Sequence, residues 1–380
     1  MTSSRQRPGS PSGELGRPAL VEQIRTLIQE TGPITFARFM ELALYAPDLG
    51  YYATLRTGAR DESGALADFQ TSPQVHPLFG RLVATELLEI WRALGRPEPF
   101  VIAEPGAGAG ELAEQILAGF AEREPTISVV YHAVDGRAPP QETTEAPVWW
   151  SNLSELRRAG TRVHCLISNE FFDALPVHRL ARIDGRLREV YVDWTEDGFA
   201  EKFGPLSDPA LAGVLGERGD AEGWRGEVCG VLNDVLEQLA GLVDNGVILT
   251  IDYGYGVADG RLGGPPGETL VAYHRHNWND DVYRRVGRQD LTSHLDFAAL
   301  FRLGRHFGLE PAGALTQRDF LLSRGLADET ERWAVLQTTP GRQWQTRFAS
   351  ADLIRPDGLG RLKVAAQRKG AVEYSLESRL

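Results

Sequence analysis

From residue 100 onward, short apolar runs alternate with segments whose apolar residues recur at helical spacing. Residues 100–103 form such a run, and residues 111–123 carry Leu112, Ile116 and Phe120 on one helical face. The same alternation continues with apolar runs at 127–134, 148–150, 163–168 and 246–251 and with helical spacing at 153–159 and 226–243. Alternation of this kind predicts a mostly parallel sheet covered by helices, so the expected fold class is α/β.

The flanking regions carry further elements. Residues 19–46 show helical spacing interrupted at Gly32-Pro33, which predicts two helices. Ser72 is a plausible N-cap for a helix that runs through residue 91, with Pro73 at its first position. The spacing also predicts a hairpin of strands 179–183 and 187–194, a helix beginning at 297 and a last strand at 361–366.

A glycine-rich turn follows the first apolar run. It reads Glu104-Pro-Gly106-Ala-Gly108-Ala-Gly110 and leads into the helix at 111–123. Glycine permits a positive φ and close approach of a ligand to the backbone, while the helix start offers free N–H groups. A dinucleotide fingerprint requires its third glycine one residue later, where Glu111 stands. The spacing E-x-G-x-G-x-G is instead typical of S-adenosylmethionine methyltransferases; a turn without a ligand is the alternative.

Polar residues follow each of the next predicted strands, where ligands bind in open α/β sheets. Asp135 follows the second strand, about 30 residues after the first glycine, and suits a carboxylate that accepts both ribose hydroxyls. Asn152 and Leu153 follow the third strand and are candidates for contact with an adenine. Asn169 ends the fourth strand and joins the candidate cofactor-binding residues. Asp252 ends the next long strand.

The segment Asn169-Glu-Phe-Phe-Asp-Ala-Leu-Pro176 gathers two carboxylates and an amide beside two aromatic rings. At a strand end, Glu170 and Asp173 suit bidentate recognition of a guanidinium and receipt of its proton. The alternative is that Asn169 and Asp173 cap the next turn and that Glu170 pairs with a nearby arginine. His294 is a further candidate general base, or a histidine bonded to a carboxylate at a helix start.

Composition narrows the classes of function. A hydrophobic content of 42% and a charged content of 24% are ordinary for a globular protein. The net charge of -12 argues against general nucleic-acid binding. Cys165 and Cys229 are too few for a disulfide framework, and no metal-ligand spacing occurs.

Location is also predicted from composition. No apolar run approaches the roughly 20 residues that span a bilayer. Residues 1–18 resemble a disordered tail rather than a signal peptide. The expected location is the cytoplasm, and the preference for arginine over lysine suggests a GC-rich bacterial genome.

Several blocks together resemble the MidA-type S-adenosylmethionine-dependent methyltransferases, a family that includes a mitochondrial complex I assembly factor with protein-arginine methyltransferase activity. The blocks are Gly32–Phe36, Tyr45–Pro47, Gly50–Tyr52, Asp68–Pro73, Phe79-Gly80, Glu104–Gly110, Asn169–Pro176, Ile251–Gly254 and Asp290–Phe297. The chain departs from the usual family pattern at Ala67, at Gln74, where a glutamate is usual, and at Asp135-Gly136.

The resemblance implies a Rossmann-like core with a seven-stranded, mostly parallel sheet, an N-terminal helical cap at 19–95 and a methyltransferase domain at 96–380. It also implies a helical insertion around 196–245 and a substrate-side segment around 255–295. Ser72 and Pro73 would help to close the cofactor site. The implied cofactor is S-adenosylmethionine and the implied substrate an arginine of a protein. A small-molecule N- or O-nucleophile and a non-catalytic assembly chaperone remain alternatives.

Overall fold

The computed structural model describes residues 15–56, 71–136, 147–257, 268–274 and 277–378. The chain divides into two compact units. Unit 2 comprises Gln70–Asp173, Leu232–Gly264 and His294–Leu380. Unit 1 comprises Met1–Phe69, Ala174–Val231 and Pro265–Ser293.

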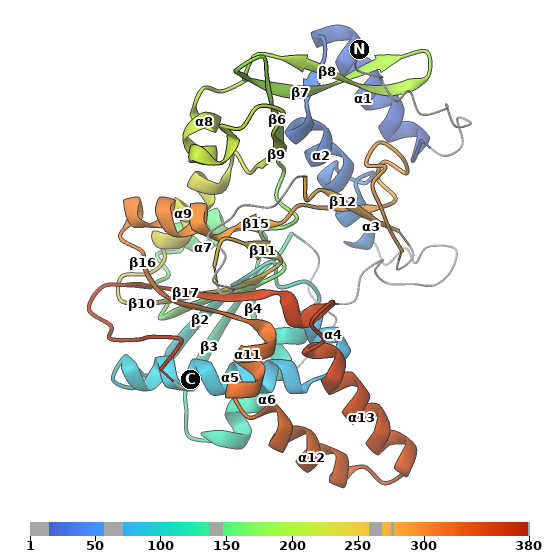
Figure 1. The fold of residues 1–380 in the computed structure, drawn as a ribbon. Helices are drawn as coiled ribbons and strands as arrows, with labels where there is room; N and C mark the ends of the chain where they lie inside the picture. The colour runs from blue at the N-terminus through green and yellow to red at the C-terminus, as the bar shows by residue number, and fades with distance from the viewer. Residues whose placement is uncertain (1–14, 57–70, 137–146, 258–267, 275–276, 379–380) are drawn as a thin grey trace. The chain divides into compact units, whose positions relative to one another are not determined.

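Unit 2 is built on a seven-stranded sheet in the order β16-β17-β10-β5-β2-β3-β4 (Figure 1). The strands are β2 (Phe100–Pro105), β3 (Val129–Val134), β4 (Val148–Trp150), β5 (Cys165–Asn169), β10 (Gly246–Asp252), β16 (Glu310–Thr316) and β17 (Lys363–Lys369). Strand β17 runs antiparallel to both of its neighbours, and the other pairs are parallel. Every residue of β10 is buried, as expected for a central strand covered on both faces.

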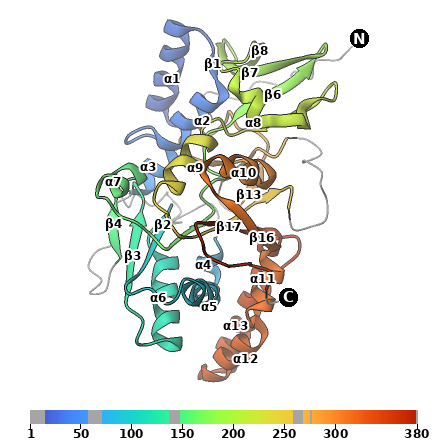
Figure 2. The ribbon, with the colours of Figure 1, turned by 90° about the vertical axis from the view of Figure 1, so that its left-hand side faces the viewer.

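Helices cover the two faces of this sheet. In Figure 1, α5 (Leu78–Ala93), α6 (Glu111–Arg123) and α11 (Gln317–Ser323) lie on one side of it, and α9 (Leu232–Ala240) and α10 (Phe297–Gly304) on the other. The remaining helices are α4 (Ser72–Val75), α7 (Leu153–Arg158), α12 (Leu326–Leu336) and α13 (Pro340–Leu353), of which the last two run side by side (Figure 2). The core joins the inner faces of α5 and α6 to the strands through residues such as Phe79, Leu87, Phe100, Ile116 and Ile167.

Unit 1 contains a five-stranded sheet in which β1 (Ile34–Thr35), β7 (Arg186–Thr195), β6 (His178–Ile183) and β9 (Arg225–Val228) are neighbours and β8 (Gly198–Gly204) pairs with β7. Helices α1 (Pro18–Thr31), α2 (Phe36–Tyr45), α3 (Tyr51–Arg56) and α8 (Ala210–Leu215) belong to the same unit. A three-stranded sheet of β12 (Val271–His274), β13 (Asn277–Asn279) and β14 (Asp290–Thr292) completes its described part.

The structure corrects the expected helix at 226–243. Residues Arg225–Val228 form β9, which pairs with β6, and the helix begins only at Leu232. Gly230 lies between the two elements, and a short apolar run containing Val228 fits a buried strand as well as a helix. The expected helical insertion is accordingly wrong in part, since β8 and β9 lie within it.

Among the described helices, none has the length and apolar content that a membrane crossing requires.

Candidate functional site

The register of unit 2 brings the carboxyl ends of its parallel strands to one edge. Pro105 is the partner of Val134 in β3, and Val134 is the partner of Trp150 in β4. On the other side, Asn169 at the end of β5 is the partner of Ile251 in β10. The segments that follow these strands therefore meet at the edge where ligands of open α/β sheets bind.

The glycine-rich turn has the predicted backbone geometry. Gly106, Gly108 and Gly110 have φ of 73°, 62° and 91°, values that side chains rarely permit. Gly110 forms the N-cap of α6 without a side-chain cap. The N–H of Gly108 donates a hydrogen bond of 2.9 Å to Oδ2 of Asp135. The structure thus places Asp135 against the turn.

Two aromatic rings line this turn. A Cβ on Gly106 would lie 2.9 Å from Cδ2 of Phe171, and one on Gly110 would lie 3.3 Å from Cζ2 of Trp149. The indole N–H of Trp149 is buried and has no hydrogen-bond partner among the described residues. Glycine at these two positions therefore leaves room for the two rings to pack against the turn, and an unpaired indole donor lies beside it.

Glu104, which ends β2 together with Pro105, is only 3% exposed. Its Oε2 accepts a hydrogen bond of 2.7 Å from the hydroxyl of Tyr131 in β3. Burial raises the pKa of Glu104 to about 8, and the carboxylates of Glu111 and Asp135 add to this while the Tyr131 hydroxyl opposes it. Tyr131 was not anticipated, because an aromatic residue in a buried strand carries no sequence signal of such a role.

The side chain of Asn152 has a structural role. Its Oδ1 accepts a hydrogen bond of 3.0 Å from the N–H of Glu155, so Asn152 is the N-cap of α7. Leu153 follows as the first helical residue, 9% exposed. The cap uses the oxygen of the amide of Asn152, and contact with an adenine by its nitrogen stays a prediction.

The segment after β5 turns sharply at Glu170, whose φ is 51°. Such backbone geometry in a residue other than glycine costs energy, so the surrounding structure must enforce it. The Nδ2 of Asn169 donates a hydrogen bond of 3.0 Å to Oε1 of Glu170, and the Oδ1 of Asn169 is buried without a partner among the described residues. Asp173 is 5% exposed and lies in the same turn as Glu170.

A further buried carboxylate, that of Asp252, supports this turn. It is fully buried, and its Oδ2 and Oδ1 accept hydrogen bonds of 2.9 and 2.8 Å from the N–H groups of Phe172 and Tyr253. Burial raises the pKa of Asp252 to about 8, with the backbone N–H donors opposing this and Glu170 adding to it. The sequence signal was present, because Asp252 ends a wholly apolar strand, but it did not reveal what the carboxylate binds.

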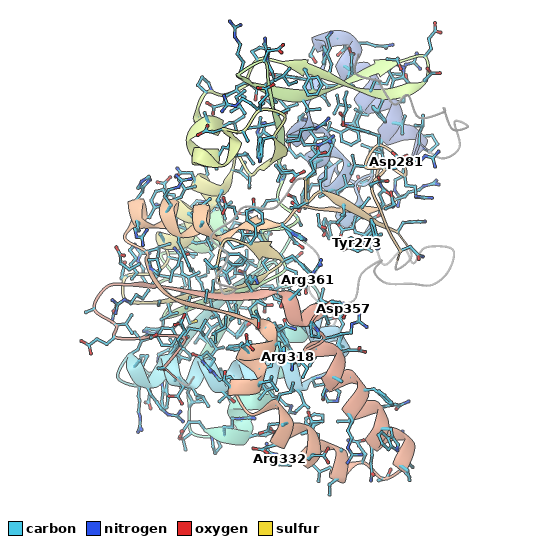
Figure 3. All side chains as sticks on the ribbon, in the orientation of Figure 1. Tyr273, Asp281, Arg318, Arg332, Asp357 and Arg361 are labelled. Carbon is cyan, nitrogen blue, oxygen red and sulfur yellow. The ribbon has the colours of Figure 1, made fainter. Side chains whose placement is uncertain are left out.

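His294 lies near Tyr253, the residue that follows β10. Its ring stacks on Tyr253 with a centroid distance of 6.1 Å, and the guanidinium of Arg361 (Figure 3) lies 5.5 Å from the centroid of the Tyr253 ring. Burial, with a smaller contribution from Arg361, lowers the pKa of His294 to about 4. The imidazole is therefore neutral at physiological pH, and a pKa this low makes it a weak proton acceptor. Helix α10 begins at Phe297, so His294 precedes the helix start.

The expected N-cap at Ser72 is wrong. Thr71 is the N-cap of α4, and its N–H donates a hydrogen bond of 3.2 Å to Oε1 of Gln74. Gln74, at the position where the family usually has glutamate, thus serves as an uncharged acceptor. Ser72 is fully buried and donates to Oε1 of Gln317, while the carbonyl of Pro73 accepts from Nε2 of Gln115. Both expected cofactor contacts are therefore engaged within the protein.

The expected single helix from Ser72 through residue 91 is divided into α4 and α5 at His76-Pro77. His76 has extended backbone angles, as a residue before proline prefers.

The profile of one protein family, described as "Putative S-adenosyl-L-methionine-dependent methyltransferase", matches residues 82–315, which is more than half of the chain. The chain belongs to this family. Its cofactor is S-adenosylmethionine, and its α/β fold is that of S-adenosylmethionine-dependent methyltransferases.

Curated relatives and a solved structure extend the comparison. The chain is 28% identical to a protein arginine methyltransferase NDUFAF7 homolog, mitochondrial, of Drosophila melanogaster, over 98% of this chain and 90% of that protein. It is 26% identical to protein arginine methyltransferase NDUFAF7, mitochondrial, of Danio rerio, over 90% and 85%. A crystal structure from Burkholderia thailandensis bound to S-adenosyl-homocysteine is similar with a TM-score of 0.78 and 26% identity, over 94% of this chain and 93% of that chain.

The methyltransferase has groups that suit this cofactor. The glycine turn has positive φ at three glycines and leads directly into the start of α6, and the buried Oδ1 of Asn169 and N–H of Trp149 are polar atoms still in need of partners. Unpaired buried polar groups near such a turn are what a polar ligand would satisfy.

Proposed function

We propose that this chain transfers the methyl group of S-adenosylmethionine to an arginine side chain of a protein. The observation that carries the proposal is the turn after β5, in which Glu170 and Asp173 stand at the edge of the sheet and Phe171 of the same turn contacts the cofactor loop at Gly106. The names of the relatives, which match most of the chain at 26% and 28% identity, support arginine as the acceptor.

The strand order of unit 2 supports our expectation of a Rossmann-like core, and the geometry of the glycine turn supports a cofactor site there. Within this site, the cofactor can come close to the main chain at Gly106, Gly108 and Gly110, because glycine has no side chain. The carboxylate of Asp135 would accept hydrogen bonds from the ribose hydroxyls of the cofactor. The Oδ1 of Asn169 would accept a hydrogen bond from a polar group of the cofactor. The relatives are named as mitochondrial proteins, so a cytoplasmic location for this chain stays a prediction.

When bound, the cofactor supplies a methyl group made electrophilic by its sulfonium. The protein must then hold an acceptor nitrogen in line with that methyl and keep its lone pair available. We assign the orientation of the guanidinium to the carboxylates of Glu170 and Asp173, since a carboxylate can accept two of its N–H groups at once. One of them receives the proton that the nitrogen releases, because the pKa of His294, about 4, makes its imidazole the weaker base.

The test uses labelled S-adenosylmethionine and a lysate of the organism that encodes the chain. We expect label in a protein band, traced to arginine by mass spectrometry. Glu170→Gln should bind S-adenosyl-homocysteine as the wild type does and transfer no label. Label confined to small molecules would contradict the proposal and favour a small-molecule acceptor. Absence of cofactor binding by folded protein would favour the non-catalytic chaperone.

A further inference from the structure

The turn that carries Glu170 is tied to β10 at two points. The N–H of Glu170 donates a hydrogen bond of 2.8 Å to the carbonyl of Ile251, the next-to-last residue of β10. Two residues later, the N–H of Phe172 donates to Oδ2 of Asp252 at 2.9 Å. Because Glu170 has a φ of 51°, its backbone conformation persists only if the surroundings enforce it. These two bonds lie on either side of Phe171 and enforce it.

Of the two anchors, only the second involves a side chain. Asp252 is 0% exposed and uses both carboxylate oxygens on backbone donors, at Phe172 and Asp173 in the turn and at Tyr253. The carboxyl is fully buried, so water cannot replace these bonds, and a backbone N–H that loses its acceptor here would be left unsatisfied. The side chain of Asp252 therefore holds the backbone of the turn, while the amide of Asn169 bonds the Glu170 carboxylate itself.

We propose that Asp252 is a positioning residue for methyl transfer: its buried carboxylate holds the Glu170 turn at the end of β10 in the geometry that orients the acceptor. This inference rests on the role proposed for Glu170. A displacement of about 1 Å at a reacting group can cost on the order of 100-fold in rate, so loss of this anchor should reduce turnover without removing the cofactor site.

The test variant is Asp252→Asn, which has the same shape but presents an amide NH₂ to at least one of these N–H donors. Glu222→Gln is the matched control. Glu222 in unit 1 accepts two hydrogen bonds of 2.9 Å from Asp184 and Gly185, and Asp184 has a φ of 50°. Glu222 is exposed whereas Asp252 is buried, so this variant controls for the loss of a carboxylate that anchors a positive-φ turn, here the β6–β7 hairpin of unit 1. Amide exchange at Phe172, affinity for S-adenosyl-homocysteine and single-turnover methyl transfer are measured for all three proteins.

We expect Asp252→Asn to speed exchange at Phe172 and to slow single-turnover transfer at least about 10-fold, with the affinity for S-adenosyl-homocysteine within about threefold of wild type. Glu222→Gln should match the wild type in all three measurements. Unchanged protection of Phe172, unchanged transfer, or an equal loss of cofactor affinity would overturn the inference. If Asp252→Asn does not fold, Asp252→Ser, which retains a hydroxyl acceptor, is judged by the same criteria.

The identity of the molecule that the wild-type protein methylates tests the proposed function, independently of the test of Asp252. A wild type that methylates a small molecule contradicts transfer to arginine, yet the ratio of the variant rate to the wild-type rate still tests the role of Asp252. Exchange at Phe172 requires no turnover, so it tests the anchor whichever acceptor is used.

Discussion

Phe171 packs against Gly106 so closely that a single methyl group on the glycine would lie 2.9 Å from its ring. Gly106 opens the turn at the end of β2, and Phe171 follows Glu170 in the turn at the end of β5. The loop that we assign to the cofactor and the turn that we assign to the acceptor are therefore in direct contact within unit 2. Each loop restricts the position of the other, as an in-line transfer requires.

Gly106→Ala should weaken cofactor binding because the added methyl group pushes the glycine turn and the ring of Phe171 apart. Alanine at a φ of 73° is strained, by about 1 to 3 kcal/mol, and its Cβ also meets Phe171. Gly160→Ala is the matched control, since Gly160 has the same φ of 73° and no atom within 4 Å of the added Cβ. We expect titration calorimetry with S-adenosyl-homocysteine to show at least a tenfold loss, about 1.4 kcal/mol, for Gly106→Ala alone. Equal affinities in the two variants would show that cofactor binding does not depend on the contact between Gly106 and Phe171.

Asp135→Asn separates two roles of one carboxylate. The asparagine retains an oxygen that can accept the hydrogen bond from Gly108, so the turn should stay folded and the melting temperature should change little. The asparagine amide has one oxygen that can accept a hydrogen bond, whereas the two ribose hydroxyls require two acceptor oxygens. We expect roughly a tenfold loss of affinity for S-adenosyl-homocysteine. Retained affinity would show that Asp135 serves only to fix Gly108.

Two substitutions of Asn152 distinguish its observed cap from the predicted contact with adenine. Asn152→Ala removes the acceptor for the N–H of Glu155 and should cost about 1 kcal/mol of stability. Asn152→Asp keeps that acceptor and removes the amide donor, so its stability should equal that of the wild type. Chemical denaturation measures the free energy of unfolding of both variants, and calorimetry measures their affinity for S-adenosyl-homocysteine. If Asn152→Asp binds S-adenosyl-homocysteine unchanged, the side chain is a cap alone.

Glu104 should make the protein less stable as the pH rises. Its pKa is about 8 in the folded protein against an ordinary value of 4.5, so the folded state holds a proton that the unfolded state releases. The resulting stabilisation is present in full below pH 4.5 and is lost as the pH rises through about 8. Between pH 6 and pH 9 this one group contributes a decrease of about 2 to 3 kcal/mol in the free energy of unfolding. Urea denaturation of wild type and Glu104→Gln at both pH values measures it, and identical pH dependence would disprove it.

Six of the seven strands of the unit 2 sheet were predicted because each has a clear apolar run, whereas β16 was not predicted. Helix α6 begins and ends at the predicted residues Glu111 and Arg123, since a glycine cap precedes it and its apolar spacing is regular. The prediction failed where a short apolar run has no distinctive period, as at Arg225–Val228. It also failed at Ser72, because Thr71 competes for the same cap and Pro77 ends the short helix.

The candidate site was predicted at the level of residue types and strand ends. The positive φ of three glycines and the placement of Asp135 beside the turn follow from local chemistry and sheet topology. The hydrogen bond from Tyr131 to Glu104, the contact of Trp149 with Gly110 and the anchoring of Phe172 by Asp252 do not. Each joins residues distant in the sequence, and the choice of partner depends on the packing of side chains across several strands.

The most direct test of the account is a crystal structure of the protein with S-adenosyl-homocysteine. We predict density along the turn from Gly106 to Gly110, with the ribose hydroxyls on Asp135 and the sulfur facing the Glu170 turn. Density at another place, or a fully formed crystal without bound ligand at saturating concentration, would contradict the assignment of the glycine turn to the methyl donor.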